Sequence, residues 1–204
     1  MIETFKHAFI GLSVLIVFIW SAIQPHDYFT WFLEVVPAII GAVVLLATYR
    51  SFKFTIFVYF LIGVHAIILM IGGHYTYAEV PLFNWIKEVF HLSRNHYDRL
   101  GHFAQGFIPA MIAREIFLRK SPLKRGKWLY FITAGICLAI SASYELFEFA
   151  VAELTGAAAD AFLGSQGDPW DTQWDMTYAL IGSNVSLIFF SKIHDRFLVR
   201  LGLE

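Results

Sequence analysis

Six apolar segments, each close to the length needed to cross a bilayer, dominate this sequence. They lie at roughly 8–24, 31–49, 54–72, 98–118, 128–151 and 175–193. A helix needs about 20 mostly apolar residues to cross the hydrocarbon core, and only helices and closed barrels satisfy their backbone polar groups there. The chain is 58% hydrophobic and 15% charged, whereas soluble domains carry about 25% charged residues. The sequence therefore predicts an all-α polytopic membrane helix bundle, with six transmembrane helices in a single integral membrane domain, residues 1–204.

The basic residues predict the orientation of these helices. Twelve of the 15 lysines and arginines lie on the side of the N-terminus and three on the other side. Because loops rich in lysine and arginine stay in the cytoplasm, both termini are expected there. The basic block at 119–127 is explained by topology, so no nucleic-acid partner is expected. The first apolar run is expected to be a retained helix, since no small-residue cleavage pattern precedes Pro25.

Two outer connections are longer than tight turns. In residues 73–97, Phe83, Ile86 and Phe90 recur at helical spacing, which predicts a short amphipathic helix in the outer interface. Residues 152–174 contain acids and glycines but no lysine or arginine. A short helix and a re-entrant segment both fit that stretch. The single cysteine, Cys137, excludes a disulfide framework and a cysteine-based metal site.

Ionisable residues gather at the outer ends of three predicted spans. Asp98, Arg99 and His102 open the fourth span, and Glu145 and Glu148 lie near the outer end of the fifth. The sixth begins at Asp175, and Asp98, His102 and Gln105 share one face of their helix. Since unpaired charge in a membrane is costly, we expect these groups to meet in one outward-facing cavity.

Carboxylates with one imidazole suit a divalent ion, namely Mg²⁺, Mn²⁺, Zn²⁺ or iron. The predicted metal ligands are His102, Glu145, Glu148, Asp171 and Asp175. A bound metal would activate water or polarise a phosphoryl or acyl group, and the predicted catalytic residues are then His102, Glu145, Glu148 and Asp175. The predicted substrate-binding residues are Asp98, Arg99, Gln105, Asp168 and Trp170. The first functional hypothesis is a metal-dependent hydrolase or transferase that acts on a membrane lipid, a lipid-linked envelope substrate or another small molecule.

Two other hypotheses use the same residues. An acidic outward-facing cavity also suits a small transporter or a protein that binds a cation, a proton or a basic ligand, and a homodimer would enlarge so small a carrier. Alternatively, Arg99 and His102 pair the acids only to lock the helices together. His65 is interpreted as a hydrogen-bonded packing residue, and Glu115 with Arg119 as an ordinary i,i+4 pair at the inner interface.

Three stretches carry a family resemblance: Ser143–Phe149, Gly167–Met176 and Asp98–Phe103. They closely resemble the YjdF-like bacterial inner-membrane proteins, which implies a multi-pass protein of the bacterial inner membrane. More distantly, the pattern is similar to the VanZ-like membrane proteins, which are associated with tolerance to glycopeptide antibiotics. That similarity rests on Asp98, Arg99, His102, Phe103, Glu145, Asp175 and Gly182. Glu148 stands where that family has glutamine, and Ala179 where it has asparagine.

Overall fold

The computed structural model describes residues 2–156 and 160–202, and every regular element in those ranges is helical. The long helices are α1 (Ile2–Ser21), α2 (Tyr28–Thr48), α3 (Ile56–Tyr75), α5 (Tyr97–Lys120) and α6 (Lys127–Thr155). A last long helix is built from α8 (Asp171–Val185), the π-helical turn η3 (Ser186–Phe190) and α9 (Ser191–Arg200). Between them lie three short elements: η1 (Tyr77–Glu79), α4 (Pro81–Val89) and α7 (Asp160–Leu163).

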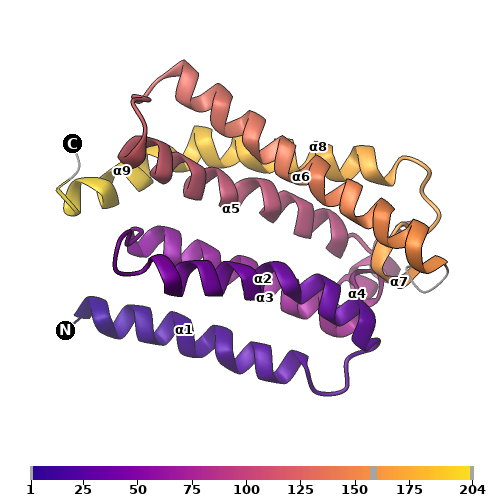
Figure 1. Cartoon of the computed structure of the whole chain (residues 1–204). Helices are drawn as coiled ribbons and strands as arrows, with labels where there is room; N and C mark the ends of the chain where they lie inside the picture. The colour runs from indigo at the N-terminus through magenta and orange to yellow at the C-terminus, as the bar shows by residue number, and fades with distance from the viewer. Residues whose placement is uncertain (1, 157–159, 203–204) are drawn as a thin grey trace.

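The long helices run side by side, with both termini at one end of the bundle and α4 and α7 at the other (Figure 1). We call these the terminal end and the loop end. Within residues 2–156 and 160–202, four helices are long and apolar enough to cross a membrane: α2, α3, α6 and the combined α8–α9. The described apolar part of α1 is shorter, and α5 is more polar. The predicted all-α membrane bundle is thus confirmed, and each predicted span falls on a helix, the last of which begins four residues early, at Asp171.

Helix α5 lies at the centre of the second half of the bundle. It packs against α3, α6 and α8, and a buried apolar core joins these helices through residues such as Val58, Ile108, Met111 and Cys137. The outer faces instead carry exposed large apolar side chains, among them Phe9, Val43, Phe131 and Ile188. A soluble monomer rarely exposes this much apolar surface, so these faces are suited to lipid.

Glycines set the close approach of α5 and α8. A Cβ atom on Gly106 would overlap the carbonyl oxygen of Ala179, and one on Gly182 would overlap the carbonyl oxygen of Phe103. Small residues allow membrane helices to approach closely enough for backbone packing. This crossing fixes the register of the two helices and brings the beginning of α8 beside the beginning of α5.

Both long connections at the loop end contain a short helix. The helix predicted within residues 73–97 is present as α4, but its exposed apolar side chains are Leu82, Trp85 and Val89. Phe83, predicted on the interfacial face, instead packs its ring 5.3 Å from that of Tyr97. For the second connection, a short helix and a re-entrant segment were the two alternatives, and the structure shows a short helix, α7. Its buried Phe162 contacts the rings of Tyr144 and Phe147, and closes the loop end over α6. The small residues 157–159 lie outside the described residues.

Candidate functional site

A buried asparagine fixes the turn that precedes α5. The Asn95 side chain donates to the carbonyl oxygen of Val80 at 3.1 Å and to Asn84 Oδ1 at 2.8 Å, and it accepts from the backbone N–H of Tyr97 at 3.0 Å. Its backbone exchanges two hydrogen bonds with the Gln166 side chain, each 2.9 Å long. Asn95 therefore joins α4, the start of α5 and the loop before α8 into one rigid support.

The loop before α8 is shaped by backbone conformations that favour glycine. Gly164 and Gly167 have φ values of 60° and 81°, a region that costs little only without a side chain. Asp168 Oδ1 then accepts the backbone N–H of Trp170 at 2.9 Å, an Asx-type turn. This turn starts α8 at Asp171, so the Gly-Asp-Pro-Trp-Asp sequence delivers Asp168 and Asp171 to the same place.

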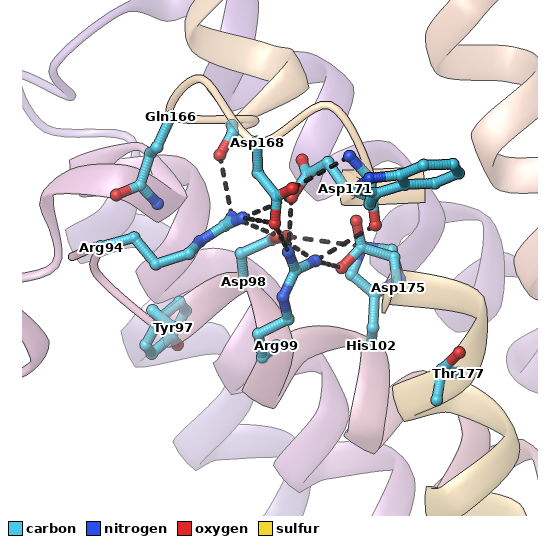
Figure 2. A network of polar contacts seen from close by, with 12 residues as sticks. Arg94, Tyr97, Asp98, Arg99, His102, Gln166, Asp168, Asp171, Asp175 and Thr177 are labelled. Carbon is cyan, nitrogen blue, oxygen red and sulfur yellow. Dashed lines mark hydrogen bonds and ion pairs between the residues drawn. The ribbon is translucent and has the colours of Figure 1, made fainter. Parts of the chain in front are cut away.

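Two arginines bind this acidic turn: Arg94 lies in the loop just before α5, and Arg99 lies in the first turn of α5 (Figure 2). Arg94 Nη1 lies 2.5 Å from Asp171 Oδ1, and Arg94 Nη2 donates to the carbonyl oxygen of Gly164 at 3.2 Å and to Asp98 Oδ2 at 3.3 Å. Arg94 was not predicted in any site. It lies in a loop, and its pairing with Asp171, 77 positions further along the chain, depends on the tertiary fold and leaves no local sequence pattern. Partial burial and the neighbouring Arg94 and Arg99 lower the pKa of His96, which disfavours a third positive charge beside the two arginines.

Arg99 holds the other side of the same cluster. Its guanidinium bonds Asp171 Oδ1 at 2.7 Å and Asp168 Oδ2 at 3.3 Å, and it also pairs with Asp175. All of these side chains except Asp168 are buried. Hydrogen bonds between a guanidinium and a carboxylate are roughly twice as strong as those between neutral groups, so the arginines lock α5 to α8.

His102 lies one turn deeper, among acids from three helices. Its Nε2 atom is 3.4 Å from Asp98 Oδ1, 3.7 Å from Asp175 Oδ1 and 3.8 Å from Glu145 Oε1. Its Nδ1 atom is fixed by Gln105 Oε1 at 3.1 Å. Glu145 Oε1 is buried and has no hydrogen-bond partner in the described part of the chain. The imidazole edge thus faces three carboxylates at distances longer than a good hydrogen bond.

A cavity of about 150 Å³ continues from His102 into the bundle. Polar groups from α2, α3, η1, α5 and α6 line this cavity, together with Phe162 of α7. The polar groups are Glu34, His65, Tyr77, Asp98, His102, Gln105, Tyr144 and Glu148. Pro37 and Pro109 also line it, and a proline inside a helix frees the carbonyl four residues earlier. The Tyr144 hydroxyl donates to Glu34 Oε2 over a long distance, 3.5 Å. The buried His65 Nε2 has no partner among the described residues, so the interpretation of His65 as a hydrogen-bonded packing residue was wrong.

The structure brings together most of the predicted site. Asp98, His102, Glu145 and Asp175 meet as expected, and Glu148 and Gln105 line the adjoining cavity. Asp171 and Asp168 turn instead toward the two arginines, and Trp170 is 63% exposed at the surface. Glu34 and His65 also line this cavity, although His65 was interpreted as a packing residue. The sequence signal for both residues is a polar side chain deep in an apolar span, which is typical of functional sites in membrane proteins.

Three donor atoms of Asp98, His102 and Asp175 all lie within 4.8 Å of one another. Two ligand atoms that each lie about 2.0–2.2 Å from one ion are at most about 4.4 Å apart, and the distances of 3.4 and 3.7 Å from His102 Nε2 to Asp98 and Asp175 meet this limit. This set differs from the predicted ligands, since Asp98 replaces Asp171 and the two glutamates. Arg99 shares Asp175 with the set, so any cation there would compete with a guanidinium for that carboxylate.

The helices and this site define a multi-pass membrane helix bundle with a buried acid–histidine cluster at one end. Residues 6–196 match a family described as "Predicted membrane protein (DUF2238)", and the chain belongs to that family. It is 48% identical over 193 residues to "Inner membrane protein YjdF" of Escherichia coli (strain K12), a match that covers 95% of this chain and 92% of that protein. No solved structure matches it. The YjdF-like resemblance and the location in the bacterial inner membrane are confirmed, whereas the VanZ-like resemblance is not shown.

Proposed function

We infer that six helices cross the membrane and that both termini are cytoplasmic, which places the loop end and its acid cluster in the outer half of the membrane. The strong excess of lysine and arginine on the terminal side supports this orientation. The polar helix α5 fits among the spans because its charged groups face α6 and α8 rather than lipid.

Single cysteines test this topology. In a Cys137→Ser background, Glu88→Cys in exposed α4 should react with a membrane-impermeant maleimide in intact cells. Lys124→Cys, on the exposed α5–α6 connection, should react only after permeabilisation. The reverse pattern would overturn the orientation and move the site to the cytoplasmic side.

We propose further that the acid cluster binds a cation, with Asp98, His102 and Asp175 as the ligands of a divalent ion. One observation supports this most strongly: beside these three groups, Glu145 presents a buried oxygen that has no partner among the described residues. A buried carboxylate without a donor is expensive, and a bound cation would offset that cost. Oxygen and imidazole donors fit Mg²⁺, Mn²⁺, Zn²⁺ or iron.

The cavity size favours cation binding without a large ligand. A volume of about 150 Å³ accommodates an ion with some water, whereas pockets for drug-sized molecules measure about 300–1,000 Å³. Glu34, His65 and Glu148 extend the polar wall beyond the ligand set into the bundle, which suits a small transporter or cation-binding protein. The metal-dependent hydrolase or transferase is the second candidate. In it Asp98, His102 and Asp175 would hold the metal, which would polarise a phosphoryl or acyl group of a lipid or lipid-linked head group, and Glu148 in the adjoining cavity would act as the general base.

Elemental analysis of protein purified in mild detergent tests cation binding. We expect about one divalent ion per chain in the wild type and its loss in His102→Gln. Asp168→Asn is the matched control, because it retains the oxygen that caps the turn and lies outside the ligand set, so it should keep the ion. Equal metal contents in His102→Gln and the wild type would overturn the site.

Proteoliposomes separate the two candidates. Flux of the cation across the membrane supports a transporter if Glu34→Gln abolishes it. Turnover of a lipid-linked head group supports the enzyme if Glu148→Gln abolishes it. If both variants bound the ion normally and lost only thermal stability, the cluster would serve to lock the helices.

A further inference from the structure

A second cavity lies on the opposite side of α3 from the acid cluster. Helices α1 and α2 each pack against α3 but scarcely against each other, and the separation of α1 from α2 is visible in Figure 1. The groove between them measures about 530 Å³. Its walls are almost wholly aliphatic, and the small residues Gly11, Ala38, Ala42 and Ala66 leave it open.

The two ends of this groove differ in chemistry. Toward the loop end, the helices close on an apolar cluster that includes Phe18, Trp31, Val35 and Met70. At the terminal end the groove is lined by His7, Tyr49 and Tyr59. His7 Nε2 and the Tyr59 hydroxyl are both buried and have no hydrogen-bond partner among the described residues. Groups of this kind are normally paired, so they point to a polar ligand group at that end.

Positive charge lies beside the same end. Exposed Lys6 immediately precedes His7 in α1, and Lys53 Nζ lies 4.8 Å from the centre of the Tyr49 ring. The groove follows α1 from His7 to Phe18, which at 1.5 Å per residue is about 16 Å. That length is close to half of the roughly 30 Å hydrocarbon core, so it matches one leaflet.

We propose that the groove between α1 and α2 binds one acyl chain of an anionic phospholipid from the leaflet at the terminal end. The chain lies along α3 with its methyl end at Phe18 and Trp31. The ester or phosphate oxygens of the head group bond to His7 and Tyr59, and Lys6 and Lys53 balance the phosphate charge. The site is independent of the cation cluster, because α3 separates the two.

A photoactivatable phosphatidylglycerol tests the bound orientation. In nanodiscs of phosphatidylglycerol, a diazirine at the end of the acyl chain should label residues around Val14 and Phe18, and a diazirine near the ester should label residues around His7. Uniform labelling of all exposed apolar faces by both probes would overturn the proposal.

Two leucine substitutions provide a matched pair. Gly11 lines the groove and Gly41 does not, and a Cβ atom at either position meets no atom within 4 Å. Gly11→Leu fills space needed by several methylene groups and should lower labelling at least about tenfold. Gly41→Leu should leave it unchanged. Tyr59→Phe, which removes one hydrogen bond, should lower retention of the lipid by up to about tenfold.

A second copy of the chain is the competing occupant. Cross-linking and native mass spectrometry of the same variants detect it. If Gly11→Leu converts a dimer into a monomer and leaves lipid labelling unchanged, the groove is a subunit interface and the lipid assignment is wrong. If Gly11→Leu abolishes labelling at an unchanged oligomeric state, the lipid assignment is supported.

Discussion

Two buried polar networks lie at opposite ends of α5, and they differ in how completely their groups are paired. At the terminal end, the fully buried Glu115 accepts from the Thr55 backbone and hydroxyl, at 2.9 and 2.8 Å, from Arg119 at 2.6 Å and from His194 at 2.9 Å. At the loop end, Glu145 and His65 retain unpartnered atoms beside a cavity. Paired networks hold helices together, whereas surplus acids beside a cavity indicate a binding site.

The terminal network also fixes the state of its histidine. Arg114 Nη1 lies 3.0 Å from His194 Nδ1, and because arginine can only donate, Nδ1 must accept. The other nitrogen, Nε2, then donates to Glu115. A neutral imidazole satisfies both partners, so this network needs no further ligand. The predicted i,i+4 pair of Glu115 and Arg119 is present at 2.6 Å, but it is part of a larger network, since Glu115 also joins α3, α5 and α9.

The largest expected effect is in the terminal network. Glu115→Ala leaves Arg119 and the capping groups of α3 without their shared acceptor, and removal of one member of a buried ionic pair costs about 3–5 kcal/mol. Thermal unfolding in detergent measures the loss. The metal content at the loop end should remain that of the wild type in the fraction that folds, and its loss there would show that the two ends are not independent.

The helix crossing between the two networks should give the next largest effect. Gly182→Ala forces α5 and α8 apart, and overpacking of a close contact costs about 1–3 kcal/mol. Because both networks depend on this crossing, stability and cation binding should fall together. Gly135→Ala in α6 is the control, since its added Cβ meets no atom within 4 Å. Equal stability of the two variants would contradict the close crossing.

A smaller effect is expected at an ordinary helix cap at the loop end. Asp27 accepts the backbone N–H of Thr30 at 2.6 Å, which lowers its pKa below the usual 3.8. Asp27→Ala should cost about 1 kcal/mol at neutral pH. Since the folded-state pKa is depressed, this contribution is present above about pH 4 and is lost as the pH falls through the lowered value. Asp27→Asn keeps a capping oxygen without titrating, so the difference between the wild type and this variant should vanish in acid.

Sequence patterns predicted the helices better than the contacts between them. The spans follow from hydropathy, and the i,i+4 spacing of Asp98 and His102 placed them on one face. The pairing of Arg94 with Asp171 depends on a loop conformation set by Gly164 and Asn95, which no local pattern reveals. The choice between α7 and a re-entrant segment depended on whether Phe162 finds a buried pocket, which is a tertiary property.

The smallest expected change in stability comes from Glu145→Gln, and it distinguishes the two ends most sharply. Glutamine keeps the shape of Glu145 but removes a charge whose Oε1 atom has no hydrogen-bond partner among the described residues and lies 3.8 Å from His102, so the free energy of unfolding should stay within about 0.5 kcal/mol of the wild type or rise. Cation binding should nevertheless weaken, because the ion loses a neighbouring negative charge. Calorimetric titration with Mn²⁺ and Zn²⁺, next to thermal unfolding without metal, measures both quantities. A Glu145→Gln protein that unfolds as easily as Glu115→Ala would place this acid in a structural network instead.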